Sequence, residues 1–266
     1  MKRVLDNDSD NDTVCDEEFL EMEDMAVEEA NTISVQACEA LGVGARFIEE
    51  WCEGVVLLGA DQAPMYFCDD YPNVRKHAEA AGLELDRLTD LKKIFWYPSN
   101  RFPSDLCICP ANIIIKGSRA RIVHDLSKVG LNGKLYVPGV NYGTMDELLR
   151  YIFPGCFIGG LDFQDCFLHW KVHATSCRRL DLRHPITNKV GVFLFLPFGL
   201  APAPGINDAN VGEVVRVCKN AVGGLHVVTF VDDLRLVNPQ DEVQLRNQSL
   251  GPSVSSNREI AFRIVV

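Results

Sequence analysis

Two short apolar segments each run directly into carboxylates, and this pattern restricts the chain more than any other feature. Phe157–Leu161 is followed by Asp162, and Leu225–Val231 is followed by Asp232 and Asp233. Short apolar runs of this kind are typical of buried strands. A strand that is apolar to its end and then charged must stop at the rim of a core, because an unpaired buried carboxylate is too costly. We therefore expect two buried strands whose acids lie at the edge of a sheet.

Two such strands, if adjacent and antiparallel, could bring their terminal carboxylates within a few ångströms. Like charges that close raise each other's pKa unless a cation neutralises them. Hard oxygen ligands on a rigid edge suit Mg²⁺, which binds few protein carboxylates and leaves room for substrate phosphates. Two ions about 3.5–4 Å apart would activate an attacking 3′-hydroxyl and stabilise a leaving pyrophosphate. Taken alone, an Asp-Asp pair after a strand is more often an ordinary turn.

The charge of the chain is divided between its two parts. The net charge is −11, but residues 1–90 carry 23 acidic against 6 basic side chains, whereas residues 91–266 carry 14 against 20. This asymmetry indicates an acidic tail attached to a domain that could meet phosphates. Residues 1–30 are acidic with few aromatic side chains, and we expect them to be disordered. Residues 31–90 have the amphipathic spacing of a helical region, and the composition changes near Leu91.

Beyond that point short strands alternate with helices. Gly117-Ser118 predicts a hairpin turn, and Thr144 is a candidate helix N-cap. Strands are expected at 112–115, 121–124, 157–161, 179–182, 190–196, 225–231 and 234–237, and helices at 74–93, 145–152 and 204–219. Mixed strands with helices on one face of an antiparallel sheet make an α+β domain.

The chain lacks the sequence features of membrane insertion and secretion. No apolar run approaches the roughly 20 residues that span a bilayer. The segment after Met1 is acidic rather than apolar, so we expect no signal peptide and an intracellular location, cytoplasmic or nuclear. The ten cysteines are irregularly spaced without paired Cys-X-X-Cys units, which favours reduced thiols over a structural zinc site.

Four motifs, which occur in the same order as in the family, resemble those of reverse transcriptases, the RNA-directed DNA polymerases of retroelements. Phe230-Val-Asp-Asp233 resembles the Tyr-X-Asp-Asp box, with Phe in the place of Tyr, and Leu161-Asp-Phe-Gln-Asp-Cys-Phe-Leu168 is similar to the first carboxylate motif. Leu196–Pro204 resembles the Leu-Pro-Phe-Gly-Leu block of retrotransposon enzymes. Arg121-Ile-Val-His-Asp125, followed by Leu131-Asn132, is similar to the fingers motif, with two extra residues before Leu-Asn. The match covers about residues 95–237 and points to a retrotransposon of the long-terminal-repeat or tyrosine-recombinase type.

The resemblance implies a polymerase palm with partial fingers over residues 91–237. Its catalytic residues would be Asp162, Asp232 and Asp233, and these carboxylates, with the Phe163 carbonyl, would hold two Mg²⁺ ions, with Mn²⁺ as a possible substitute. The implied partners are deoxynucleoside triphosphates and a primed RNA or DNA template, with no membrane. The oligomeric state does not follow from the resemblance.

The same resemblance implies a set of substrate-binding residues. Arg121 matches the fingers arginine that reaches the triphosphate, and Lys116 is a candidate basic neighbour, although its spacing is unusual for the family. Asp165 lies where the family has an acid beside the triphosphate. Phe167 matches the position whose ring excludes a 2′-hydroxyl. The remaining two are Phe198, which would pack against the nascent base pair, and Gly199, which would let backbone approach it.

The resemblance ends after Val237. Residues 238–266 match neither the later palm elements nor a helical thumb, so we expect a core cut off before its thumb. Three functions are therefore considered: an RNA-directed DNA polymerase core, an inactive retroelement remnant or non-catalytic nucleic-acid-binding module, and an RNA-directed RNA polymerase. Phe167 at the sugar-selecting position disfavours the third.

Overall fold

A computed structural model describes residues 34–98, 102–103, 105–117, 119–221, 225–231 and 233–238. Over this part the chain is an α+β protein with small antiparallel sheets, as expected. The predictions for residues 1–30 and 239–266, and for Asp232, lie outside the described residues.

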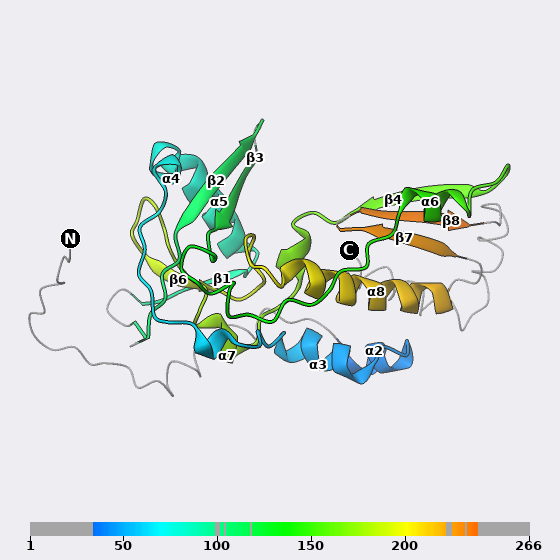
Figure 1. Ribbon diagram of the computed structural model, residues 1–266, viewed down its shortest axis with the longest axis horizontal. Coiled ribbons are helices and arrows are strands. Elements are labelled where there is room, and N and C mark those ends of the chain that lie inside the picture. Colours follow the sequence, from blue (N-terminus) through cyan, green and yellow to red (C-terminus); the bar gives the residue numbers. More distant parts are fainter. Residues whose placement is uncertain are drawn as a thin grey trace, which may run out of the picture.

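Helices and strands are mixed along the chain (Figure 1). The helices are α2 (Val35–Ala40), α3 (Ala45–Glu53), α4 (Pro72–Lys76), α5 (Ala78–Asp90), α6 (Met145–Leu149), α7 (Ala174–Cys177) and α8 (Ala203–Ala221), with 3₁₀ turns η1 (Ala60–Gln62) and η2 (Cys166–His169). The strands are β1 (Ile94–Trp96), β2 (Ala111–Lys116), β3 (Arg119–His124), β4 (Phe157–Asp162), β5 (Asp181–Arg183), β6 (Val190–Phe193), β7 (His226–Phe230) and β8 (Asp233–Asn238). They form three sheets, with orders β1-β6-β5, β2-β3 and β4-β8-β7.

The β4-β8-β7 sheet lies against α8, and α2 and α3 lie on the other side of that helix (Figure 1). Val211 and Val215 of α8 are one turn apart and pack against Val227 of β7 and Leu234 of β8. Val214 and Val217, on another face of α8, pack with Trp51 of α3 and its neighbours. Because α8 is covered on two faces, it serves as the middle layer of a sheet–helix–helix stack.

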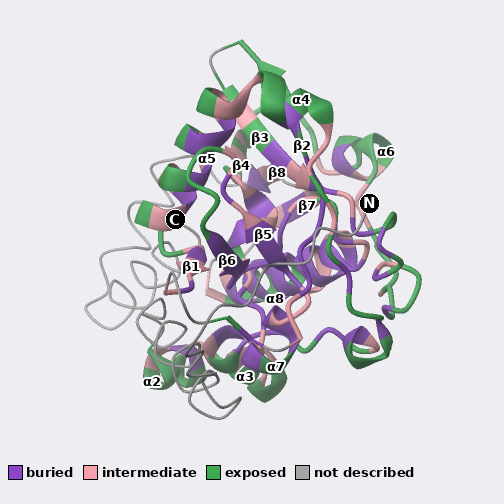
Figure 2. Cartoon of the chain, turned by 90° about the vertical axis from the view of Figure 1, so that its left-hand side faces the viewer, coloured by how far each residue is buried: buried purple, intermediate pink, exposed green. Residues whose placement is uncertain are grey.

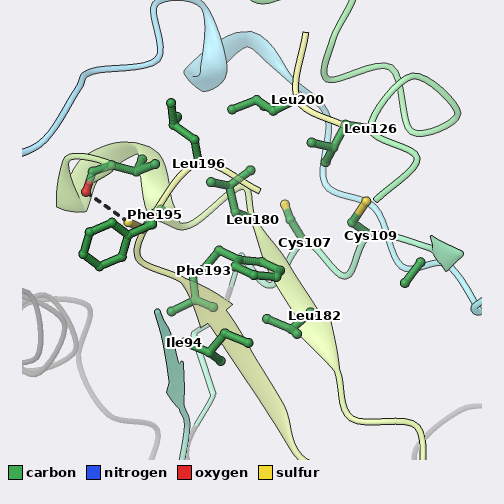
Figure 3. Close-up of a cluster of buried hydrophobic side chains, with 14 of the residues drawn as sticks. Ile94, Cys107, Cys109, Leu126, Leu180, Leu182, Phe193, Phe195, Leu196 and Leu200 are labelled. Atoms are coloured by element: carbon green, nitrogen blue, oxygen red, sulfur yellow. Dashed lines mark hydrogen bonds between the residues drawn. The ribbon is translucent and has the colours of Figure 1, made fainter. Parts of the chain in front are cut away.

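The largest hydrophobic core surrounds the β1-β6-β5 sheet. All four residues of β6 are buried, and Figure 2 shows β5 and β6 almost wholly in the buried colour. Side chains of the core converge from strands and from the loops that follow them, including Cys107, Cys109, Leu126, Leu182 and Phe193 (Figure 3). This core also contains Leu85 and Leu88 of α5, so it joins residues on both sides of position 90.

The β2-β3 hairpin stands on this core with α4 and α5 beside it. Its strands pair in full register from Ala111 with His124 to Lys116 with Arg119. Residues of one face, such as Ile113 and Ile122, are buried, whereas Arg121 on the opposite face is exposed. The predicted hairpin is confirmed.

Most other expected elements are present with shifted ends. Thr144 caps α6 as predicted, its Oγ1 accepting a hydrogen bond from Glu147 N at 3.1 Å. The helix expected over 74–93 is instead two, α4 and α5, because His77 leaves the helical conformation with φ −118°. The short strand β1 was not predicted; it pairs with β6 through Ile94 and Phe193.

The strands form three separate sheets, and β4, β7 and β8 pair only with each other in the described part of the chain. One expectation about burial is wrong. The strand Phe157–Leu161 is not buried: every residue of β4 is exposed or partly exposed. The other edge strand, β7, is buried at Val227 and Val228 because α8 and α6 pack against its two faces, whereas among the described contacts of β4 Leu161 alone packs in a hydrophobic cluster. None of the helices within the described ranges is both long and apolar enough to span a membrane.

Candidate active site

Asp162 and Asp233 lie directly opposite each other in the antiparallel β4-β8 ladder. Asp162 is the last residue of β4 and Asp233 is the first of β8, so the pair closes one end of the sheet. Directly opposed residues have Cβ atoms about 4.5–5.5 Å apart and project to the same face. Their neighbours Leu161 and Leu234 pack toward α8, so both carboxylates lie on the face of the sheet away from that helix.

The strand beside β4 is not the one expected. β7, the apolar strand that precedes Asp232, pairs only with β8 among the described strands, and β8 separates it from β4. β4 and β7 are each antiparallel to β8 and therefore run in the same direction. β4, which ends at Asp162, and β7, which ends two residues before Asp232 in the sequence, therefore finish at the same end of the sheet. The predicted clustering of the acids requires this arrangement. Asp232 itself is outside the described residues, so its distance from Asp162 stays untested.

Asp233 forms an ion pair with Arg235, whose Nη2 lies 3.1 Å from its Oδ1. Arg235 is the register partner of Gly160, and a Cβ atom at Gly160 would overlap with the Arg235 guanidinium. Glycine at this position therefore leaves the space that Arg235 occupies. Both side chains of the pair are 40% exposed, and ion pairs this exposed are worth at most about 1 kcal/mol.

The two described carboxylates, Asp162 and Asp233, suit a divalent ion. Asp162 is exposed at the strand end, and the ion pair that Asp233 forms with Arg235 is weak. Carboxylate oxygens on a strand edge are suitable hard ligands for Mg²⁺. No group of three or more metal-binding side chains occurs among the residues that the structure describes, a set that excludes Asp232. Phe163, whose carbonyl was the fourth predicted ligand, directly follows β4, and its ring lies 6.0 Å from that of His169.

Three of the predicted substrate-binding residues form one cluster, in which Phe198 contacts both Arg121 and Phe167. The Arg121 guanidinium lies over the Phe198 ring, with Cζ 4.4 Å from the ring centroid. The Phe198 and Phe167 rings are tilted against each other with centroids 5.5 Å apart. Arg121 comes from β3, Phe167 from η2 and Phe198 from the loop after β6, so this cluster unites three of the four sequence motifs.

The Pro-Phe-Gly turn is fastened to the fingers motif by backbone and side-chain bonds. His124 N donates to Phe198 O at 2.8 Å. The Asn132 amide donates to Gly199 O at 3.0 Å and accepts from Ala201 N at 2.9 Å. Gly199 has φ +105°, a conformation that favours glycine, and a Cβ atom there would overlap with the His124 carbonyl. Glycine is thus required for close packing inside the protein, whether or not a substrate also approaches.

Lys116 lies at the turn end of the β2-β3 hairpin, on the same exposed face as Arg121. Arg121 pairs with Ile114, and Lys116 pairs with Arg119 two positions nearer the turn. Because residues two apart share a face of a strand, Lys116, Arg119 and Arg121 make one basic face. Arg119 was not singled out in the sequence, although its alternation with Arg121 was visible there.

The Asp165 carboxylate is paired with an arginine of the protein itself. It has φ +56° and forms an ion pair of 2.8 Å with Arg87 of α5. Arg87 also binds Glu84 at 2.7 Å, and the Glu84 hydrogen bond, aided by the charge of Asp165, raises the pKa of the guanidinium. Nearby Lys93 has a pKa lowered to about 8 by burial, an effect that Asp165 opposes. Asp165 therefore links the first carboxylate motif to α5, and Arg87 could not be connected with it from the sequence.

Asn207 of α8 is a further residue that sequence reasoning missed. Its side-chain amide donates to Val231 O at 2.9 Å, in the turn between β7 and β8. No motif marked it, because its partner is 24 residues away in a separate motif. Comparison with known proteins adds no relative to these observations: no protein-family model matches this chain, and no curated protein matches it significantly.

Proposed function

We propose that this chain is the fingers and palm core of an RNA-directed DNA polymerase that adds deoxynucleotides to a primer 3′-hydroxyl. The observation that carries the proposal is the pairing of Asp162 with Asp233 at the end of the β4-β8 ladder. In this proposal the β4-β8-β7 sheet is the palm sheet, and its face away from α8 is the catalytic face. The order of the four motifs supports the same assignment.

Asp162, Asp232 and Asp233 would hold two Mg²⁺ ions, which when bound supply activation of the 3′-hydroxyl and stabilisation of the leaving pyrophosphate. Arg121 would bind triphosphate oxygens, since a planar guanidinium suits phosphate and is held here by the Phe198 ring. Phe167 contacts the same Phe198 ring, and in the proposal it lies beneath the sugar and excludes a 2′-hydroxyl.

The exposed basic face of the hairpin, Lys116, Arg119 and Arg121, offers contacts to phosphates. Affinity from phosphate contacts falls steeply with salt, and the chain as a whole carries a net charge of −11. Extension of a primed template should therefore be weak, distributive and suppressed by moderate salt.

Primer extension tests it directly, with Mg²⁺, deoxynucleotides and a primed RNA template at low salt. Extension by the wild-type chain should be abolished by Asp232→Asn, because the amide keeps the shape but removes the metal-binding charge. Asp61→Asn, an exposed acid in η1, is the matched control and should extend normally. Extension that survives Asp232→Asn would refute the assignment. A folded chain that binds primed template but never extends it would instead support the non-catalytic nucleic-acid-binding module.

A further inference from the structure

Val231 adopts a backbone conformation that a β-branched residue rarely takes. Its φ is +58°, and it lies between β7 and β8, immediately before Asp232. The left-handed region is strained for such residues, and strain of this kind persists only where the surroundings hold it. The pairing of Phe230 with Asp233 closes this turn, and the Asn207 amide nitrogen donates a hydrogen bond to Val231 O within it, 2.9 Å long.

The orientation of the Asn207 side chain is determined by Trp170. The Trp170 indole N–H donates to Asn207 Oδ1 at 2.7 Å. An indole nitrogen can only donate, so the amide oxygen must face Trp170 and the amide NH₂ must face the Val231 carbonyl. Asn207 is 1% exposed, so its own amide atoms are shielded from water. Trp170, Asn207 and Val231 therefore form a directed chain of hydrogen bonds with one possible polarity.

We propose that Asn207, oriented by Trp170, is a positioning residue for the Asp232-Asp233 pair. The carbonyl that Asn207 binds belongs to the peptide group joining Val231 to Asp232. In the proposal this hydrogen bond fixes the orientation of that peptide group, and with it the direction in which the chain continues into Asp232 and Asp233. The inference rests on the proposed function, since it assigns Asn207 to the same carboxylates. Asn207 itself has no contact with substrate in this assignment.

The chain contains a matched control one turn away on the same helix. The Trp51 indole N–H donates to Asn210 Oδ1 at 2.6 Å, and Asn210 is as fully buried as Asn207. The Asn210 amide, however, donates back to Ile206 O within α8, at 2.9 Å. The two asparagines have the same chemistry and burial, and only Asn207 reaches the turn before Asp232. A difference between their variants therefore reports on positioning rather than on helix stability.

The test compares Asn207→Leu with Asn210→Leu, and Trp170→Phe with Trp51→Phe, in the full chain. Mn²⁺ binding is measured by electron paramagnetic resonance, and amide hydrogen exchange is followed in peptides covering residues 227–235. Asn207→Leu should weaken Mn²⁺ binding at least tenfold and accelerate exchange in the turn. Asn210→Leu should change Mn²⁺ binding less than twofold at a comparable loss of thermal stability. Trp170→Phe should reproduce the Asn207 effects in weaker form, and it serves as the readout if Asn207→Leu does not fold.

Equal effects of the Asn207 and Asn210 variants on both measurements would overturn the inference and leave Asn207 a merely structural residue. Failure of the proposed function has a different signature, because the wild-type chain would then not bind Mn²⁺ at all. In that case the exchange measurement decides the inference alone. Faster exchange in the turn for Asn207→Leu only would support it, and equal exchange for both variants would overturn it.

Discussion

Asp162 and Asp233 are direct register partners across the antiparallel β4-β8 ladder, on the face of the sheet away from α8. Two like charges directly opposed on neighbouring strands destabilise a sheet. Binding of a cation between two such carboxylates would remove the repulsion and stabilise the folded protein. Arg235 offsets part of the repulsion by pairing with Asp233 at 3.1 Å, but that pair is exposed and weak.

Asp162→Asn should therefore raise the stability of the metal-free chain while removing its response to divalent ions. Loss of one opposed charge is worth up to about 1 kcal/mol in the free energy of unfolding. Wild-type protein should be stabilised by added Mn²⁺, because a ligand that binds only the folded state shifts unfolding. Thermal unfolding in chelator and in Mn²⁺ measures both effects. Glu79→Gln, an exposed acid of α5, should behave as wild type, and equal Mn²⁺ stabilisation in Asp162→Asn would contradict the site.

Phe167→Ala should let ribonucleotides compete with deoxynucleotides, because it empties the space proposed to lie beneath the sugar. Loss of the contact with Phe198 should also loosen that ring, whose centroid lies 5.5 Å away. The measurement is the ratio of kcat/KM for ribonucleotide and deoxynucleotide in single-nucleotide addition. Phe167→Tyr keeps the ring and should retain the wild-type ratio. An unchanged ratio in Phe167→Ala would mean that Phe167 is only a packing residue.

Two glycine-to-alanine changes should have opposite effects on stability. Gly199→Ala places a Cβ atom on the His124 carbonyl at a backbone φ of +105°, so it should destabilise strongly. The backbone strain alone is worth about 1–3 kcal/mol. Gly212, inside α8, has nothing within 4 Å of an added Cβ, and alanine there should stabilise by about 0.5–1 kcal/mol. Urea unfolding of both variants checks the signs, and a neutral Gly199→Ala would show that the turn relaxes.

Buried Asp181 should make the free energy of unfolding depend on pH. Burial raises the pKa of Asp181 to about 7, although Cys107 N and the Tyr97 hydroxyl each donate a hydrogen bond to it at 2.7 Å. Between about pH 4 and pH 7 the folded state then holds a proton that the unfolded state has lost. Stability should fall as pH rises through this window, with a limiting slope of about 1.4 kcal/mol per pH unit.

Asp181→Asn isolates this effect from other titrating groups, because the amide cannot ionise and the difference from wild type reports on position 181 alone. Urea unfolding at pH 5, 6, 7 and 8 should show wild-type stability declining relative to the variant up to about pH 7 and then levelling off. Parallel pH profiles for the two proteins would show that the Asp181 carboxyl titrates normally.

Local pattern was sufficient for most individual elements. The β2-β3 hairpin follows from two short apolar runs around Gly117-Ser118, and α6 follows from Thr144 and the acids after it. The end of β4 at Asp162 and the start of α8 near Pro204 also agree with the pattern. Each of these features depends on residues within a few positions of one another. Burial was less predictable, because it depends on what packs against a strand: β4 is exposed, whereas Val227 and Val228 of β7, at the other edge of the same sheet, are buried.

The sequence alone determined that Asp162 and Asp233 lie at the ends of strands, because an apolar run followed by acids is a property of consecutive residues. Only the tertiary structure decided that β8 lies between β4 and β7, and that Asp233 is the partner of Asp162. The same holds for Arg87 on Asp165 and for Asn207 on the Val231 carbonyl. Such contacts join residues far apart in the chain, and they are chosen by the packing of whole elements against each other, which no local spacing records.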